Sequence, residues 1–444
     1  MIDVKGNKII NKISNALGSF YFNPILLVFG FICWEFNLTN LVVSGFCLAF
    51  VLILIFCKDV KNIFTPLFFI AFFIPDIATM TDYTVYFIGA GGAVAFLLGY
   101  AIYKVIKDRK TIKRGKFFIG LLCSFVAFLL GGIIGRFNFI RTATIFFFCL
   151  AILIFYFLCV NYTENLKEYF EKLFIIGAII IGVQITQTNL LDEIKVFFSA
   201  IGLNTAVLFV TLGIIACFTK AFDNKYDYLY FVLILVLTLF VVLTRCRMGM
   251  LLTAVIDVVF TIMLFVKSKN KLKIVALFLL ALLIVGLCMA FSEVLRNSII
   301  RAFTGKQGIS GRDSLWAFCL ERFAEHPVFG YGFFYDGVIP SLREGFKLIL
   351  THNTFLQWLC CTGVVGTLIM VVFYTNKYGL LCKGFNKQRI FVFTSVIMVE
   401  LSGMMDQAAT MDPFLPILVI LLVSCVEQEN NTEKLKIKET IKEI

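Results

Sequence analysis

Charged residues are scarce in this chain: only 15% of its 444 residues are Asp, Glu, Lys or Arg, and 60% are hydrophobic. Soluble domains have about 45–50% apolar residues, so this composition excludes an ordinary soluble protein. The apolar stretches recur about every 20 residues, the length that a helix needs to cross a bilayer core of about 30 Å. They do not alternate as the strands of a membrane barrel do. Because backbone groups in lipid must be satisfied within their own segment, these stretches are predicted to be helices.

Patterns that hold metal ions or disulfides are also missing. The 14 Cys residues are scattered, most of them singly within apolar stretches, and none forms a CxxC pair. This spacing indicates neither a metal site nor a disulfide framework. The predicted outer loops contain no acidic pair of the Asp-x-Asp type, and the whole chain has just 2 His. We therefore expect no metal site.

The net charge of +12 comes from Lys residues that cluster between apolar segments, which argues against nucleic acid as a partner. The clusters lie in residues 104–116, 267–273, 377–387 and 434–442. Threading the chain with its N-terminus inside places every cluster in the cytoplasm, as the positive-inside rule requires. The lysines are therefore interpreted as loop anchors.

We predict an all-α polytopic membrane protein with about twelve to fourteen spans, because twelve true spans with re-entrant pieces fit as well as fourteen. The fourteen candidate spans are 21–36, 41–57, 63–79, 83–103, 117–135, 140–160, 173–188, 198–218, 229–244, 248–266, 274–291, 351–374, 389–404 and 412–426. The chain then divides into a transmembrane bundle of about eleven spans (1–291), a large extracytoplasmic loop (292–350), C-terminal transmembrane helices (351–426) and a cytoplasmic tail (427–444).

Arginine is distributed differently from lysine. The predicted topology places nine of the arginines outside: Arg136, Arg141, Arg245, Arg247, Arg296, Arg301, Arg312, Arg322 and Arg343. One interpretation is that several of them pair with acidic residues of a folded loop. For the whole set, an anionic ligand is the better explanation, because guanidinium suits phosphate and carboxylate groups.

The loop 292–350 is the one long hydrophilic stretch between spans, and ordered loops of this length usually carry function. Its segment SGRDSLWAFCLERFAEHPVFG places Leu315, Trp316, Cys319, Leu320 and Phe323 at helical spacing. This spacing predicts an amphipathic helix that lies against the membrane face or the bundle.

Both histidines lie in or beside this loop. His326 precedes Pro327 and is interpreted as structural or as a contact at the rim of a substrate site. His352 opens the next predicted helix beside Asn353, where it is either a simple helix-start residue or a general base. We favour the base, and we expect Gly363 and Gly366 to let another helix approach closely.

Arg245 and Arg247 form a second candidate site in the segment LTRCRMGML, at the outer end of a predicted span. They are either interface anchors or a clamp for a pyrophosphate at the depth of the lipid headgroups.

In these motifs, roughly from 240 to 375, the chain resembles the O-antigen polymerase and O-antigen ligase superfamily. His352-Asn353 followed by Gly363 and Gly366 resembles the family signature, and Arg247 with Leu251 resembles its Arg motif, although Cys246 stands where Ser is common. Gly311-Arg312 followed by Trp316 resembles the start of the large loop. The segment His326-Pro327-Val-Phe-Gly-Tyr-Gly332 resembles the part of the loop just before the signature.

The resemblance implies a metal-independent glycosyltransferase of the GT-C kind that needs no cofactor and uses an undecaprenyl-pyrophosphate-linked glycan as donor and a second one as acceptor. Arg247 and Arg312 would hold the pyrophosphate, and His352 would activate the acceptor hydroxyl. The expected substrate contacts are Arg245, Arg136, Arg141, Arg322, His326, Asn353 and Trp316. The expected location is the bacterial cytoplasmic (inner) membrane, with the active site facing the periplasm or cell exterior and a chain-length regulator and a flippase as partners.

Three functions stay open. The leading hypothesis is a polymerase that joins lipid-linked repeat units into O-antigen, capsule or exopolysaccharide. The close alternative is a ligase that transfers the finished glycan to lipid A core or to a protein. A transporter of lipid-linked sugars would instead need internal repeats and charges buried in mid-span, and Asp257 is the one such charge we note.

Overall fold

The structure is a computed structural model in which every regular element of the described residues is a helix. The described residues are 8–36, 38–67, 83–108, 113–135, 139–191, 197–244, 246–291, 293, 296, 300, 312–332, 352–386, 389–405 and 417–429. The protein is therefore an all-α polytopic membrane protein, as predicted.

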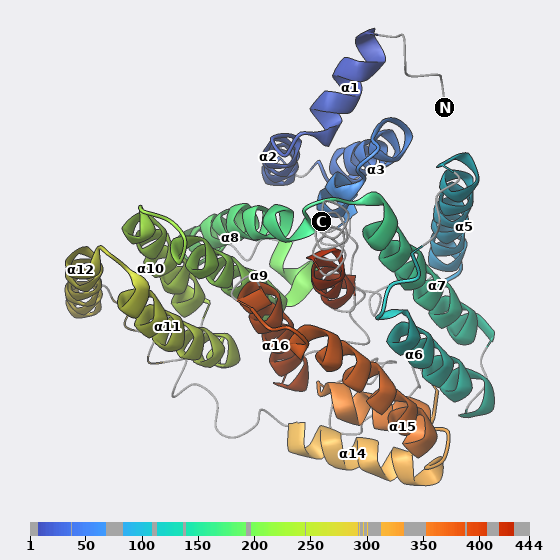
Figure 1. Ribbon diagram of the computed structural model, residues 1–444. Coiled ribbons are helices and arrows are strands. Elements are labelled where there is room, and N and C mark those ends of the chain that lie inside the picture. The colour runs from blue at the N-terminus through green and yellow to red at the C-terminus, as the bar shows by residue number, and fades with distance from the viewer. Residues whose placement is uncertain are drawn as a thin grey trace, which may run out of the picture.

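The helices, shown in Figure 1, are α1 (Lys8–Gly18), α2 (Phe22–Glu35), α3 (Thr39–Phe56), η1 (Lys61–Ile63), α5 (Tyr83–Asp108), α6 (Phe118–Leu130), η3 (Gly131–Gly135), α7 (Phe139–Tyr162), α8 (Leu166–Leu191), α9 (Phe197–Ala221), α10 (Asp227–Leu243), α11 (Arg247–Lys267), α12 (Lys271–Phe291), α14 (Arg312–Glu325), α15 (Thr354–Cys382), α16 (Ile390–Met405) and a final helix over 417–429. The final helix continues past 426, where the C-terminal helices were predicted to end. The predicted span 63–79 lies mostly outside the described residues.

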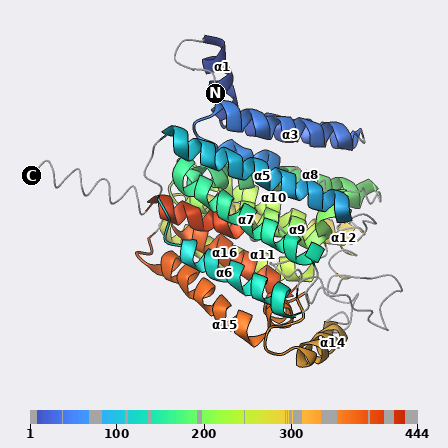
Figure 2. The same ribbon diagram turned by 90° about the vertical axis from the view of Figure 1, so that its right-hand side faces the viewer.

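Seven helices of the described residues are long and apolar enough to cross a membrane if α15 is counted as one helix, or eight if α1 and α2, bent by 73°, form one span. Three shorter apolar helices join them: Ser44–Phe56, Asp227–Leu243 and Ile390–Met404. The total of twelve to fourteen spans stays a prediction. Figure 2 shows the long helices side by side, with α14 at one end of the bundle.

Burial separates the centre of the bundle from its lipid-facing edge. The apolar window of α9 is 83% buried, because α8, α10, α11 and α16 pack around it. In α12 only 6% is buried, although its mean hydropathy of 3.1 is the highest among these windows. Such a helix, apolar all round and exposed, fits lipid as its surroundings, and α12 lies at the edge of the bundle in Figure 1.

The Lys-rich turns meet at one end of the bundle, which we call the Lys-rich end. The backbone N–H of Lys113 donates to Asn161 Oδ1 (3.0 Å), and Arg389 Nε donates to Glu429 Oε2 (3.0 Å). The turn between α11 and α12 joins the turn between α9 and α10 through Asn270 Nδ2, which donates to Lys225 O (3.0 Å). The Lys-rich turns that the structure describes therefore share one end of the bundle, whereas the predicted cluster at 434–442 lies outside the described residues.

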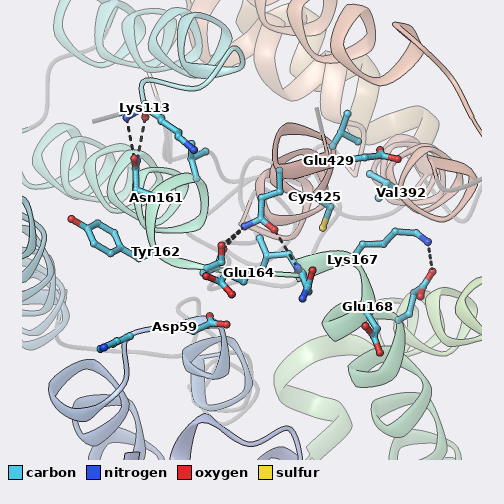
Figure 3. Close-up of a pocket in the computed structure, with 18 of the residues that line it drawn as sticks. Asp59, Lys113, Asn161, Tyr162, Glu164, Lys167, Glu168, Val392, Cys425 and Glu429 are labelled. Atoms are coloured by element: carbon cyan, nitrogen blue, oxygen red, sulfur yellow. Dashed lines mark hydrogen bonds and ion pairs between the residues drawn. The ribbon is translucent and has the colours of Figure 1, made fainter. Parts of the chain in front are cut away.

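A polar cavity of about 1080 Å³ opens at the Lys-rich end. Figure 3 shows Asp59, Lys113, Asn161, Glu164 and Lys167 around it. The cavity is lined from the turn after α3, the residues before α6, the turn between α7 and α8, and the final helix. These turns and the final helix therefore share one polar cavity.

The directions in which the helices run place the sequence motifs at the opposite end, which we call the motif end. Helix α9 reaches the Lys-rich end at Lys220, so Asn204, near its start, lies toward the motif end and contacts Cys246. Helix α16 starts beside Arg389 at the Lys-rich end, so Met404 lies toward the motif end and contacts Asn353.

Candidate active site

Helix α15 is two helical arms that fold back on each other at Gly363. Gly363 has φ 65° and ψ −169°, a conformation far from helical. In a continuous helix, 16 residues would separate Trp358 from Tyr374 by about 24 Å along the axis. Their ring centroids are instead 5.1 Å apart, and those of Phe355 and Tyr374 are 5.7 Å apart. The prediction of one continuous span over 351–374 is therefore wrong: a first arm (354–362) runs antiparallel to a second arm (364–382).

The segment 327–332 completes the backbone hydrogen bonding at this break. Tyr331 N donates to Cys360 O (2.7 Å) and Gly332 N donates to Cys361 O (3.1 Å). In return, Val364 N donates to Pro327 O (2.9 Å). An unsatisfied backbone group at membrane depth costs several kcal/mol, so a broken helix there needs such a partner. The segment that resembles the family's loop motif is therefore a structural clamp on the broken helix.

Glycines make this close packing possible. Gly330 and Gly363 both have positive φ, at 77° and 65°, which is the region that glycine adopts without strain. A Cβ on Gly330 would lie 2.5 Å from Gly363 N, and one on Gly131 of η3 would lie 2.5 Å from Cys361 O. Gly363 was expected to admit a neighbouring helix. It instead reverses the chain and admits the clamp segment, while Gly131 allows the close helix contact.

His352 lies in a strained elbow at the base of the first arm. Its φ is 50°, a left-handed conformation that is uncommon for residues other than glycine, although His is enriched there. Asn353 is the N-cap: its Oδ1 accepts from Leu356 N (3.0 Å) and its Nδ2 donates to Met404 O (3.2 Å). Thr354 Oγ1 donates to Gly403 O (2.8 Å). The elbow therefore rests on the last turn of α16, and a held strain of this kind is typical of functional sites.

Arg247 is the first residue of α11, and its side chain is exposed. The helix is capped by Cys246, whose Sγ accepts from Gly249 N (3.3 Å) and donates to Asn204 Oδ1 (2.8 Å). The thiol therefore does what a Ser would do at this N-cap position. Ser402 of α16 lines the same small cavity as Cys246. It directly precedes Gly403, whose carbonyl oxygen accepts the hydrogen bond from Thr354. Cys246, next to Arg247, and the His352 elbow thus both lie near the last turns of α16.

The predicted amphipathic helix is present as α14, and it packs against the bundle. Leu315 and Cys319 are buried, and Cys360 Sγ of the first arm donates to Cys319 O (3.3 Å). Leu320 was expected on the same face but is 48% exposed, because it lies about 100° around the helix from Cys319. Arg312 begins α14 at the motif end.

Two outer arginines pair with acidic neighbours, as the alternative interpretation allowed. Arg322 Nη1 lies 2.7 Å from Glu325 Oε1, and this hydrogen bond raises the pKa of the guanidinium. Arg296 lies 3.6 Å from Glu293. Helix geometry separates the backbones of Arg312 and Arg322 by about 15 Å along α14, so the two lie nearly three turns apart.

Of the remaining predicted substrate contacts, the structure describes some side chains and not others. Trp316 is half-buried in α14, and the exposed His326 packs edge-on against Tyr331, with ring centroids 4.8 Å apart. Arg141 belongs to α7, but its side chain is outside the described set, as are Arg136 and Arg245 entirely. The motif end therefore gathers Arg247, Arg312, Trp316, His326, His352 and Asn353.

A buried ion pair between Lys377 and Glu400 was missed from the sequence. Lys377 was assigned to a cytoplasmic turn, and Glu400 fell within the candidate span 389–404. Lys377 is instead inside α15 with its side chain 0% exposed, and its Nζ contacts Glu400 Oε1 of α16. The signal was the apolar run Leu380–Leu381 after Lys377, which continues the helix to Cys382.

Comparison with known proteins bears on the same part of the chain. The model of a family described as O-antigen ligase matches residues 230–371. An O-antigen ligase of Pseudomonas aeruginosa is 27% identical over 141 residues, which are 32% of this chain and 33% of that protein. The match thus spans about a third of that relative. Both matches are to proteins of the O-antigen ligase kind, and they confirm the resemblance to the O-antigen polymerase and ligase superfamily seen from 240 to 375.

Proposed function

We propose that this chain is a membrane glycosyltransferase that joins undecaprenyl-pyrophosphate-linked repeat units into O-antigen, capsule or exopolysaccharide. The observation that carries the proposal is that the start of α11 at Arg247 and the His352 elbow both lie near the last turns of α16. Both belong to the segment that matches the O-antigen ligase family.

In the proposed reaction, His352 takes the proton from a hydroxyl of the acceptor sugar. The oxygen then attacks the anomeric carbon of the donor glycan, and the bond from that carbon to the pyrophosphate oxygen breaks. The lipid pyrophosphate leaves with the electron pair. Arg247 and Arg312 stabilise its growing negative charge through charge-assisted hydrogen bonds, without a bound metal. A positioned general base of this kind contributes about 10²–10⁴-fold to rate.

The polymerase and the ligase differ only in the acceptor. The relative from Pseudomonas aeruginosa is named an O-antigen ligase, and this name favours transfer of a finished glycan as the second candidate function. A polymerase extends chains when single lipid-linked repeat units are the only substrate. A ligase needs a separate acceptor, such as lipid A core, and a transporter forms no new bond. Incubating the purified protein in liposomes with lipid-linked repeat units, with and without such an acceptor, separates all three.

The test of the proposed base uses His352→Asn, because Asn also tolerates the left-handed conformation but cannot accept the proton at neutral pH. We expect the rate of glycan transfer to fall by about 10²-fold or more, with unchanged thermal stability. The measurement is the glycan ladder formed in liposomes by equal amounts of folded protein. A ladder of wild-type length formed at the wild-type rate would exclude His352 as the base.

A further inference from the structure

The Lys377–Glu400 ion pair lies inside the helical bundle, where the two charges need a reason to be present. The side chains of Lys377 and Glu400 are 0% and 15% exposed. Lys377 Nζ also lies 4.0 Å from the ring centroid of Tyr374, and Tyr374 OH donates to Glu400 Oε2 (3.1 Å). Removing two charges from water is expensive, so a buried pair is weak evidence for stability, and within a membrane bundle it points to function.

The ion pair is connected to the His352 elbow by two routes. Along α16, Glu400 lies one turn before Gly403 and Met404, whose carbonyl oxygens accept hydrogen bonds from the two residues after His352. Across α15, Phe355 stacks on the Tyr374 ring at an interplanar angle of 24°. Tyr374 in turn donates its hydroxyl hydrogen to Glu400. Glu400 is thus linked to the first residues of the first arm in two ways, through the last turn of α16 and through the Tyr374 ring.

We propose that Glu400 and Lys377 are positioning residues that hold the His352 elbow in its left-handed conformation. A strained backbone persists only where its surroundings over-determine it, and the pair joins the second arm of α15 to α16 at the turn on which the elbow rests. The inference rests on the proposed function of His352 for its kinetic consequence. Neither charged group touches substrate in this account.

The pair can be replaced without leaving a lone buried charge. Single substitutions such as Glu400→Leu uncover the partner charge and are expected to reduce the amount of folded protein. The double variant Lys377→Met with Glu400→Leu removes both charges, and such replacements are often neutral for stability. The double variant Lys377→Gln with Glu400→Gln is the conservative second variant, because it removes both charges together and keeps amide groups that can hydrogen-bond at both positions.

The expected kinetic result for the double variant is a kcat lowered by about 10- to 100-fold, as for a small displacement of a catalytic group. KM for the lipid-linked substrate and thermal stability should stay at wild-type values. The double variant Lys377→Gln with Glu400→Gln should fold and show a smaller fall in kcat of the same kind. Wild-type kcat in the Lys377→Met with Glu400→Leu variant would show that the pair is only structural.

A second readout does not depend on activity. The chain has just 2 His, so modification by diethyl pyrocarbonate, followed by mass spectrometry, compares His352 with His326 in one sample. His352 is half-buried and His326 is exposed. Loosening the elbow should speed the modification of His352 and leave that of His326 unchanged. Unchanged modification of His352 would overturn the proposal even if kcat fell. If His352→Asn kept full activity, the proposed function would fail, while this labelling would still test the positioning.

Discussion

Arg247 is the first residue of α11. The backbone N–H groups of the first turn of a helix have no hydrogen-bond partner within that helix. Cys246 Sγ accepts from Gly249 N, so it satisfies one of these groups. The N-terminal end of a helix also carries a partial positive charge that favours anions. A pyrophosphate beside Arg247 would therefore meet both a guanidinium fork and the favourable end of the helix dipole.

Substituting Arg247→Lys tests the guanidinium fork, because it keeps the charge but cannot donate two parallel hydrogen bonds. A charge-assisted hydrogen bond contributes about 1.5–3 kcal/mol, so we expect kcat/KM to fall by about tenfold or more. The matched control is Arg296→Lys, whose guanidinium pairs with Glu293 and is 42% exposed. Equal activity of the two variants in the liposome assay would make Arg247 a simple interface anchor.

The candidate site residues that could be predicted from the sequence are those whose polarity contrasts with their neighbours in the chain. His352 and Arg247 stand out because each is a polar residue beside an apolar segment. Lys377 was misassigned because hydropathy alone places a lysine near a helix end in the adjoining turn. Its partner Glu400 lies 23 residues away on another helix, and a single sequence does not show such a pairing.

The two arms of α15 are the element on which the candidate site is built. The chain reverses at Gly363, the clamp segment 327–332 satisfies the backbone there, and α14 packs on the first arm. The site therefore depends on one residue that can adopt φ 65° against a packed backbone.

Gly363→Ala should destabilise the protein. An alanine there would be strained by about 1–3 kcal/mol at positive φ, and its Cβ would lie 2.5 Å from Gly330 N. We expect a lower melting temperature and little glycan transfer. Gly379→Ala, in the same helix with nothing within 4 Å of the added Cβ, should behave as wild type. A Gly363→Ala protein as stable as the Gly379→Ala protein would contradict the hairpin at Gly363.

At this scale, helical spacing was sufficient to predict the helix α14 and the buried positions of Leu315 and Cys319, although it wrongly placed Leu320 with them. Hydropathy could not reveal the break in α15, since both arms are apolar and the reversal depends on one φ angle. Gly330 and Gly363 were both visible in the sequence motifs. That they pack against each other could not be predicted, because the contact forms only in the folded chain.

The whole molecule separates two chemistries at its two ends. Lysines and a polar cavity occupy the Lys-rich end, and His352, Arg247 and α14 occupy the motif end. This separation was predictable, because the positive-inside rule acts on every turn along the chain. The number of spans was not, since α1 and α2 are bent by 73° and α15 folds back on itself.

The most direct test of the account is the side of the membrane on which the motif end lies. Ala324 is exposed on α14 and Lys269 is exposed in the turn between α11 and α12. Single cysteines introduced at these positions are labelled with a membrane-impermeant maleimide in intact cells whose outer layers are permeable, with the unmodified chain as background. We predict labelling of Ala324→Cys in intact cells and of Lys269→Cys only after the cytoplasmic membrane is broken. The opposite pattern would place the candidate site in the cytoplasm and contradict the proposed mechanism.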